Sequence, residues 1–495
     1  MKNLIVLFFT LAMFTVHGQI KWTSVESVYK NLIVAIGDGS KIAPPIEPSR
    51  TESRVAYYSP SRQTVYVEEK FLTVCATFGP DSLNALAFIL GHELAHFYRN
   101  HGWASASGMG YIDAEMKADW KSMKSESANR AKDESEADIF SGFYSLIAGY
   151  DAMPVAEKTL KALYKSYGIP DSIPGYPTLA QRVGIADNAM AKSRSLYVQF
   201  NVGIYCLATE KFNIASKIFT SIYNDDYAGG EILNNLAISE ILQGYQILGE
   251  SPTYYYPVFI STETPLDPDS RGGEGEEHIR TGIMYLKEAL KKEDNNVLLF
   301  TNLASAYAML NEFVDAEYYV SKIEAIDASN QAAYCLRGII ASKKGDKKLA
   351  KSIWKKHMKE NALISKNYAA QFEKTPEPVF AEAKADASVL QIVDEVDLSS
   401  RDFKSNFSFE VVKLPGLKIS YVELENSMII EVYGGSGIDY RFQSFKSSDF
   451  ETSNFSWQKV LRSNSSTIEN SQNYNVLKMS KTDAEIPVYV KYVWY

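Results

Sequence analysis

The sequence predicts an α+β protein with three folded parts: a mainly helical N-terminal part with a small β-hairpin, an α-helical solenoid, and a C-terminal all-β domain. Three observations predict this order: an apolar helical pattern around residues 92–96, small residues that recur every 34 positions, and short alternating strands near the end of the chain. We therefore expect folded parts at residues 19–190, 191–375 and 385–495.

The first residues have the composition of a signal peptide. Residues 1–18 contain Lys2, a largely apolar run at residues 4–16, and the small residue Gly18. This run is shorter than the roughly 20 residues that cross a bilayer, and no later run reaches that length. We expect a periplasmic or secreted protein with no transmembrane anchor.

The overall composition excludes some partners. The chain has 51 basic and 60 acidic residues and a formal net charge of −9, which argues against nucleic acid or an anionic membrane surface as partner. Cys75, Cys206 and Cys335 each lie in an apolar context and are expected to be buried. Whether Cys206 pairs with Cys335 stays open.

The segment before residue 70 predicts a β-hairpin. Residues 54–59 and 64–68 alternate as short strands do, and Ser59, Pro60 and Ser61 favour a turn between them. We expect the second strand at residues 64–68.

Residues 92–96, His-Glu-Leu-Ala-His, place two imidazoles four positions apart with a carboxylate between them. A capping start at residues 80–82 and an apolar run before His92 predict a helix. On a helix both rings lie on one face and can bind one metal ion. The pattern therefore predicts His92 and His96 as zinc ligands, and Glu93 as the general base that accepts a proton from metal-bound water.

A second acidic segment, residues 133–138, opens another apolar helical pattern. A glutamate from this helix would complete a site of two histidines and one glutamate and leave the fourth zinc position open for water. We choose Glu136 over Glu134 as this third ligand. Asp138 is then placed to accept the N–H of a ligand imidazole and to fix its tautomer.

Together these segments resemble the gluzincin superfamily of zinc metalloendopeptidases that includes HtpX and the CAAX prenyl protease. The resemblance rests on residues 92–101 (HELAHFYRNH), 136–138 (EAD) and 149–151 (GYD). It implies a mainly helical peptidase domain with polypeptide substrates and one catalytic Zn²⁺ ion on the three ligands named above. It also implies that the hairpin precedes the zinc helix, so the strand at 64–68 is either an edge that aligns substrate or an ordinary protected edge.

Residues 176–182 match the family's His-Pro-x-x-x-x-Arg segment except at the first position, where Tyr176 replaces histidine. In soluble relatives that histidine can close over the zinc. A phenol with a pKa near about 10 is a poorer ligand, so we expect Tyr176 either to plug the site sterically or to donate a hydrogen bond to the oxyanion. Arg182 is the other candidate oxyanion donor, unless it ties a loop to the acidic helix.

After residue 190, small residues recur at a fixed interval. Gly203 and Ala237 are 34 positions apart, as are Ala304 and Gly338. This period resembles the tetratricopeptide repeat, whose helical hairpins stack into a solenoid, and it implies protein partners that bind through the repeats. Residues 251–277 interrupt the second repeat, and their tyrosines form either a partner-binding loop or a packed lid.

The last part of the chain is rich in predicted strands. These are residues 406–412, 417–423, 428–432, 440–444, 456–461 and 488–495, separated by Gly, Asn and Ser turns. They favour a sandwich or a small barrel that the resemblance to the proteases does not cover.

The layout of peptidase and repeats resembles that of the β-barrel assembly-enhancing proteases of bacterial envelopes. This resemblance implies a zinc endopeptidase that acts on misfolded or misassembled envelope proteins. The alternative is a scaffold or chaperone, non-proteolytic or rarely active, that works through its repeats and β domain. An intact Glu93 favours the enzyme, because a scaffold needs no general base.

Overall fold

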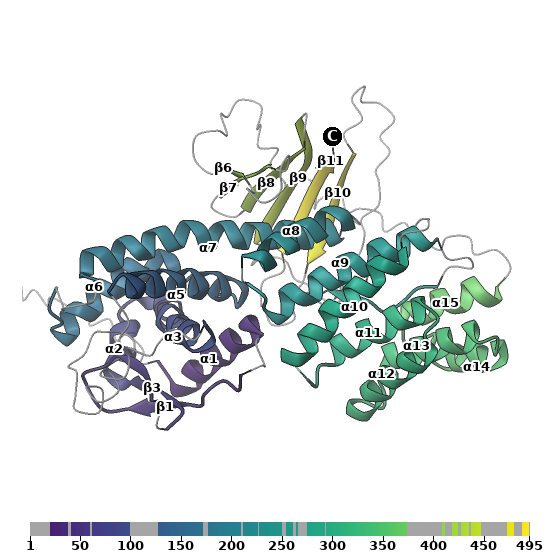
Figure 1. Cartoon of the computed structure of the whole chain (residues 1–495), viewed down its shortest axis with the longest axis horizontal. Helices are drawn as coiled ribbons and strands as arrows, with labels where there is room; N and C mark the ends of the chain where they lie inside the picture. Colours follow the sequence, from purple (N-terminus) through teal and green to yellow (C-terminus); the bar gives the residue numbers. More distant parts are fainter. Residues whose placement is uncertain are drawn as a thin grey trace, which may run out of the picture. The chain divides into compact units, whose positions relative to one another are not determined.

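The computed structural model describes residues 20–37, 41–59, 62–99, 127–171, 177–208, 211–225, 227–249, 254–260, 264–265, 275–292 and 294–373, and the strands between residues 408 and 494 (Figure 1). The chain divides into two compact units, Met1–Val34 with Ala43–Ser193 and Ala35–Ile42 with Arg194–Tyr495. The predicted signal peptide lies outside the described residues.

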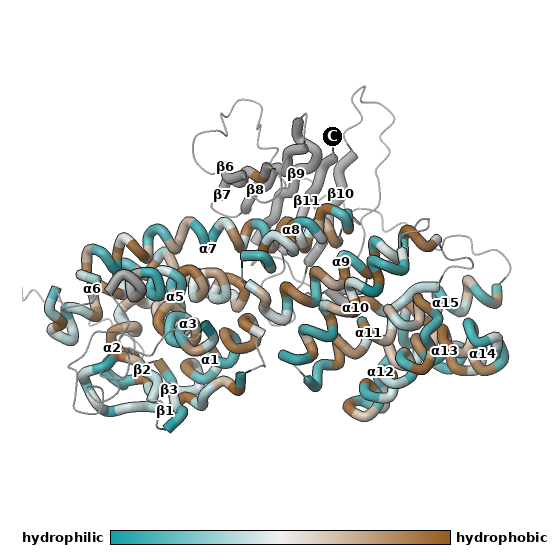
Figure 2. The backbone as a smooth tube through the Cα atoms, viewed as in Figure 1, coloured by the Kyte–Doolittle hydropathy of each residue, from teal (hydrophilic) through white to brown (hydrophobic). Residues whose placement is uncertain are grey.

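The first unit is mainly helical, as predicted. Its helices are α1 (Trp22–Ile36), α2 (Glu69–Ala76), α3 (Ser82–Arg99), α5 (Ser127–Ile147), α6 (Ala156–Tyr167) and the first part of α7 (Leu179–Ala208). Short 3-10 turns at Gly79–Asp81 and Met153–Val155 precede α3 and α6. Figure 2 shows hydrophobic and hydrophilic residues alternating along α7, and in its first part buried residues recur at helical spacing, at Arg182, Ala186, Ala189 and Ser193.

Helices α3 and α5 lie side by side in the core of this unit (Figure 1). A Cβ atom added at Gly91 of α3 would lie 2.5 Å from Ser141 Oγ of α5. The Ser141 hydroxyl in turn donates a hydrogen bond of 3.1 Å to the Phe88 carbonyl. Small residues at this crossing let the two helices approach closely enough for their side chains to share one site.

A small sheet precedes α3 in the sequence. Within the described part of the first unit its strand order is β1 (Ile46–Ser49), β3 (Thr64–Glu68), β2 (Ala56–Ser59). The predicted hairpin is confirmed, since β2 and β3 pair antiparallel. The prediction that residues 64–68 form an edge is wrong, because β1 pairs with β3 in parallel on its other side. A central strand has its backbone groups paired on both sides and cannot accept an added peptide.

The turn that leads into β2 is fixed by a buried carboxylate. Glu68 Oε1 accepts hydrogen bonds from Thr51 Oγ1 (2.8 Å), the Ser53 N–H (3.0 Å) and the Arg54 N–H (2.8 Å). The next residue, Val55, is fully buried and has a φ of 63°. A β-branched residue in the left-handed region is strained, so these bonds hold the chain in a conformation it would otherwise avoid.

Helices form most of the described part of the second unit. They are the last part of α7, α8 (Phe212–Asn224), α9 (Gly230–Leu248), α10 (Gly275–Lys292), α11 (Val297–Met309), α12 (Phe313–Ile326), α13 (Gln331–Lys343), α14 (Lys347–His357) and α15 (Ala362–Phe372). Successive helices pack on one another: α8 on α9, α9 on α10, α11 on α12 and α13 on α14. The described part of the predicted insertion lies between α9 and α10 and includes the short strands β4 (Phe259–Ile260) and β5 (Thr264–Pro265).

Two of the predicted small positions lie where helices touch. A Cβ atom at Gly203 would lie 2.6 Å from the Phe219 ring, and one at Gly338 would lie 2.0 Å from Trp354 Nε1. Asparagine side chains begin α11, α13 and α15 by accepting N–H groups of the first turn, a common N-cap. Local sequence therefore determines where several of these helices begin and which faces meet.

The described strands of the C-terminal part form an antiparallel sheet. Its order is β10 (Asn473–Met479), β11 (Val488–Trp494), β9 (Gly437–Lys446), β8 (Ser427–Gly434), β7 (Lys418–Glu423), β6 (Ser408–Glu410). Five of these strands overlap predicted strands, while Asn473–Met479 was not predicted. The predicted strand at residues 456–461 lies outside the described residues.

Two further predictions concern cysteine and membrane segments. Cys75, Cys206 and Cys335 are buried, as predicted, and all three are free thiols in the structure. In the part of the chain that the structure describes, no helix has the length and apolar character required to span a membrane.

Candidate metal centre

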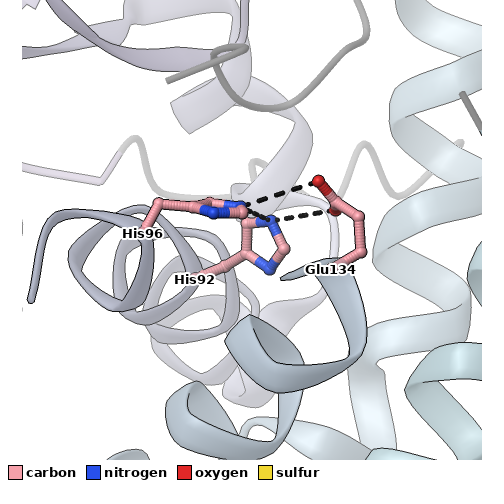
Figure 3. A group of neighbouring side chains, drawn as sticks. All are labelled: His92, His96 and Glu134. Carbon is pink, nitrogen blue, oxygen red and sulfur yellow. Dashed lines mark hydrogen bonds and ion pairs between the residues drawn. The ribbon is translucent and has the colours of Figure 1, made fainter. Parts of the chain in front are cut away.

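Helices α3 and α5 bring two histidines and a glutamate together in the core of the first unit. His92 and His96 lie one turn apart on α3 and face Glu134 of α5 (Figure 3). His92 Nε2 lies 3.3 Å from Glu134 Oε2, His96 Nε2 lies 3.6 Å from Glu134 Oε1, and the two Nε2 atoms are 3.0 Å apart. One ligand atom from each side chain lies within 4.8 Å of the others, so this trio could hold a metal ion.

The choice of Glu136 as third ligand is wrong in this structure. Glu136 lies on another side of α5, where it accepts a 2.6 Å hydrogen bond from Arg99 Nε. The reason is helical geometry: α5 begins at Ser127, so residues 133–138 lie within it rather than at its start. Positions two apart on a helix are turned by about 200°, whereas Glu134 and Asp138 are four apart and share a face.

Asp138 has the predicted role. Its Oδ1 lies 2.7 Å from His92 Nδ1, so this carboxylate accepts the imidazole N–H and leaves Nε2 free for a metal. Asp138 is fully buried, which a lone carboxylate could not be without compensation. That compensation comes from His92 and from an arginine on α7.

Arg182, in the first turn of α7, supplies this positive charge. Its Nη1 lies 3.1 Å from Asp138 Oδ2 and 3.1 Å from Glu134 Oε2, and its Nη2 donates to Asp138 Oδ1 at 3.3 Å. The side chain is 3 % exposed. These contacts match the alternative that the sequence left open, an arginine that ties a neighbouring segment to the acidic helix. Tyr176, the other candidate oxyanion donor, lies outside the described residues.

The electrostatics of the cluster favour a cation between the three side chains. Burial opposes charge on His92, but the carboxylates of Glu134 and Asp138 outweigh it and raise the pKa of His92 to about 10. Burial also opposes charge on Glu134, and Arg182 and His92 outweigh it and hold the pKa of this carboxyl well below its ordinary value. In the metal-free chain the raised pKa therefore favours a protonated, cationic His92.

Glu93 is buried beside the cluster without a partner of its own. It is 1 % exposed, and neither carboxylate oxygen has a hydrogen-bond partner among the described residues. Burial raises the pKa of Glu93 to about 8, with an opposing effect from His92. An unpaired buried carboxyl is costly to maintain unless a ligand or water meets it, so this group marks a functional position.

The side chains of His92, His96 and Glu134 have the chemistry of a zinc site. The donors are two imidazole nitrogens and one carboxylate, the set found in catalytic zinc sites that keep a fourth position open. The imidazole of His92 is oriented by Asp138, and the orphaned oxygens of Glu93 lie in the same buried region. The residues present therefore fit a zinc ion.

Comparison with known proteins agrees with this geometry. Residues 25–159 match peptidase family M48. A comparison with curated proteins gave no match. The matched segment contains His92, His96, Glu134 and Glu93, and ends before Arg182. The chain therefore carries a domain similar to peptidase family M48, and this likeness, with the buried cluster, supports a metallopeptidase acting on polypeptides.

Proposed function

We propose that this protein is a zinc-dependent endopeptidase with His92, His96 and Glu134 as metal ligands and Glu93 as the general base. The observation that carries the proposal is the buried cluster of three ligands beside a carboxylate whose two oxygens have no hydrogen-bond partner in the described chain. A structural metal site would have no use for such a group.

Each side chain has a defined part in hydrolysis. When bound, zinc supplies a Lewis acid that lowers the pKa of water and polarises the scissile carbonyl. Glu93 accepts a proton from the attacking water and transfers it to the leaving amine. Asp138 holds His92 in the tautomer that presents Nε2. Arg182 pairs with both buried carboxylates, Glu134 and Asp138, and favours the charged form of Glu134.

The remaining assignments are proposals about the rest of the chain. The packed helices from α7 to α14, with Gly203 and Gly338 at close contacts, support tetratricopeptide repeats that bind substrates or partners. The strands after residue 408 support a C-terminal β domain. With the signal-like segment at residues 1–18, we propose a periplasmic or secreted enzyme that acts on misfolded or misassembled envelope proteins.

Metal analysis combined with a cleavage assay tests the enzyme. The purified chain should contain about one zinc per molecule and should cleave casein, and a chelator should abolish cleavage until zinc is restored. The Glu93→Gln variant, prepared in parallel, controls for a contaminating protease. Zinc-replete protein that leaves casein and unstructured peptides intact would favour the scaffold alternative.

A further inference from the structure

A segment outside regular secondary structure lies against four helices of the second unit. Residues 254–258, Tyr-Tyr-Tyr-Pro-Val, belong to the connection between α9 and α10. Tyr254, Tyr256 and Val258 are buried, with 6 %, 1 % and 1 % of their surface exposed. Their partners lie on α9, α11, α13 and α15, which follow one another as alternate helices of the chain. We call the face that these four helices present to the segment the inner face.

The inner face holds the backbone of this segment. Asn367 of α15 accepts the Tyr255 N–H at 3.0 Å and donates to the Tyr255 carbonyl at 2.8 Å. The Ser305 hydroxyl of α11 donates to the Pro257 carbonyl at 2.8 Å. The two helices α11 and α15 thus bind the main chain of one irregular segment, as peptide-binding proteins bind the backbone of an extended ligand. The bidentate contact is possible because an amide side chain carries both a donor and an acceptor.

The inner face also recognises the tyrosine side chains. The Tyr254 hydroxyl lies 3.1 Å from Ser342 Oγ, and Lys343 Nζ donates to the Tyr256 hydroxyl at 3.1 Å. The same ammonium group lies 5.7 Å from the Tyr254 ring centroid and 5.8 Å from the Tyr256 ring centroid. A cation between two rings favours aromatic side chains at both positions.

We propose that the inner face is a polypeptide-binding site whose resident occupant is residues 254–258 of the same chain, a tethered ligand that excludes other tyrosine-containing polypeptide segments. α9 ends at Leu248 and α10 begins at Gly275, so the segment can leave the site without breaking either helix. The site takes a non-helical segment with tyrosines two positions apart and reads its backbone through Asn367.

Residues 254–258 are covalently joined to the helices that bind them. This connection determines how strongly they exclude a free peptide from the inner face. A ligand that is joined covalently to its own binding site has an effective concentration on the order of 1 mM. A free peptide with a Kd of about 10 μM for the empty site would then bind the wild-type chain about 100-fold more weakly. Weakening the resident segment should therefore reveal the site to an added peptide.

A peptide-binding experiment on the full-length chain tests the proposal. The probe is a fluorescein-labelled synthetic peptide with the sequence of residues 251–260, SPTYYYPVFI, followed by fluorescence anisotropy. The variant Tyr254→Ala/Tyr256→Ala should bind this peptide about 100-fold more tightly than wild type. Tyr318→Ala, which removes a 55 % exposed tyrosine from α12, is the matched control and should behave as wild type. A peptide N-methylated at the residue corresponding to Tyr255 should bind the double variant weakly, because it lacks the N–H group that donates to Asn367 Oδ1.

A milder variant covers the case in which the alanine pair does not fold. Tyr254→Phe/Tyr256→Phe keeps both rings and removes only the hydroxyl bonds to Ser342 and Lys343, each equivalent to about a fivefold change in equilibrium. Circular dichroism checks the fold, and this pair should still bind the peptide several-fold more tightly than wild type. A folded variant of either kind that binds no better than wild type overturns the proposal.

Thiol labelling gives a second readout at the same place. Cys335 is buried, and its Sγ donates to the Tyr255 carbonyl at 3.7 Å, so the resident segment covers it. Cys335 should react faster in the alanine variant than in wild type, and the added peptide should slow it again. Cys75 of α2 and Cys206 of α7 are also buried free thiols and serve as internal controls. Equal Cys335 labelling in folded wild type and variant, with no effect of peptide, also overturns the proposal.

Discussion

The carboxylate of Glu93 carries the central prediction at the scale of single residues. Glu93→Gln should retain zinc, because the ligands are untouched, and should lose on the order of 10²–10⁴-fold in kcat/KM on an unstructured peptide, because the amide cannot accept a proton. The variant should melt close to the wild-type temperature, because a neutral amide of the same size replaces a buried carboxyl whose pKa burial already raises to about 8. Turnover within about tenfold of wild type would remove Glu93 from the role of base.

A pair of matched substitutions distinguishes the two candidate third ligands. Glu134→Gln should lower zinc affinity by more than the roughly 10–100-fold that loss of an outer hydrogen-bond partner costs. Glu136→Gln, two positions away on α5, should keep its zinc, because Glu136 pairs with Arg99 and not with the histidines. Metal content after dialysis against a weak chelator measures both variants. Loss of zinc from the Glu136 variant alone would restore the assignment made from sequence.

Much of the site could be predicted from sequence at this scale. The spacing of His92 and His96 requires only a helix, and the helix follows from its capping residues and apolar run. The error at Glu136 has a physical reason that the sequence did contain. If Asp138 contacts an imidazole, a ligand on the same helix must share its face, and Glu134 at four positions satisfies this while Glu136 at two does not. Arg182 could not be placed, because its contacts depend on where α7 packs.

Two glycines give a prediction at the scale of helices. Gly91→Ala places a methyl group 2.5 Å from Ser141 Oγ, so it should force α3 and α5 apart, destabilise the chain by about 1–3 kcal/mol and weaken zinc binding. Gly184→Ala in α7 meets nothing within 4 Å and should stabilise the chain by about 0.5–1 kcal/mol. Chemical denaturation of both variants, with metal analysis, measures the contrast. A Gly91 variant as stable as wild type would show that the crossing can relax.

Strands were harder to predict than helices, and for different reasons. The hairpin of β2 and β3 is local, and its turn residues mark it. β1 was missed because it is short and contains Pro48, a residue that disfavours a strand assignment. The position of β3 between β1 and β2 depends on a parallel pairing across many residues, which alternation along one strand cannot reveal. β10 was also missed, although polar and apolar residues alternate from Asn473 to Val476.

Metal binding should release protons, and this is a prediction for the whole molecule. In the metal-free chain burial opposes protonation of His92, but Glu134 and Asp138 raise its pKa to about 10, so at neutral pH the metal must displace this proton. Because the pKa is raised, apparent zinc affinity should fall as pH falls below about 10, by up to tenfold per pH unit for each proton released. Titration calorimetry in buffers of different ionisation enthalpy counts the protons. Binding at pH 7 without proton release would contradict the assignment.

At the scale of the whole molecule the sequence predicted the kinds of secondary structure but not how they pack. A mainly helical first part with a small sheet is present, and strands follow residue 408. The repeat period identified small residues at helix contacts, such as Gly338 against Trp354, but a period alone does not show what covers the inner face. The tyrosine-rich segment was left open between a partner-binding loop and a packed lid. Its buried contacts with α11, α13 and α15 decide for packing, since they arise only after the helices have stacked.

Because of helix α7, the peptidase part cannot be transferred to another protein as a segment that ends where the family likeness ends. The likeness to family M48 ends at residue 159, yet Arg182 of α7 supplies the charge that balances Glu134 and Asp138. The same helix continues to Ala208, beyond the point at residue 193 where the first unit ends. A chimaera joined at the limit of the likeness would lack this arginine, and His92 and His96 would then be left to balance the two buried carboxylates. A graft that keeps the site intact must therefore extend through the first turn of α7, so recombination would preserve the site only where breakpoints fall after Arg182.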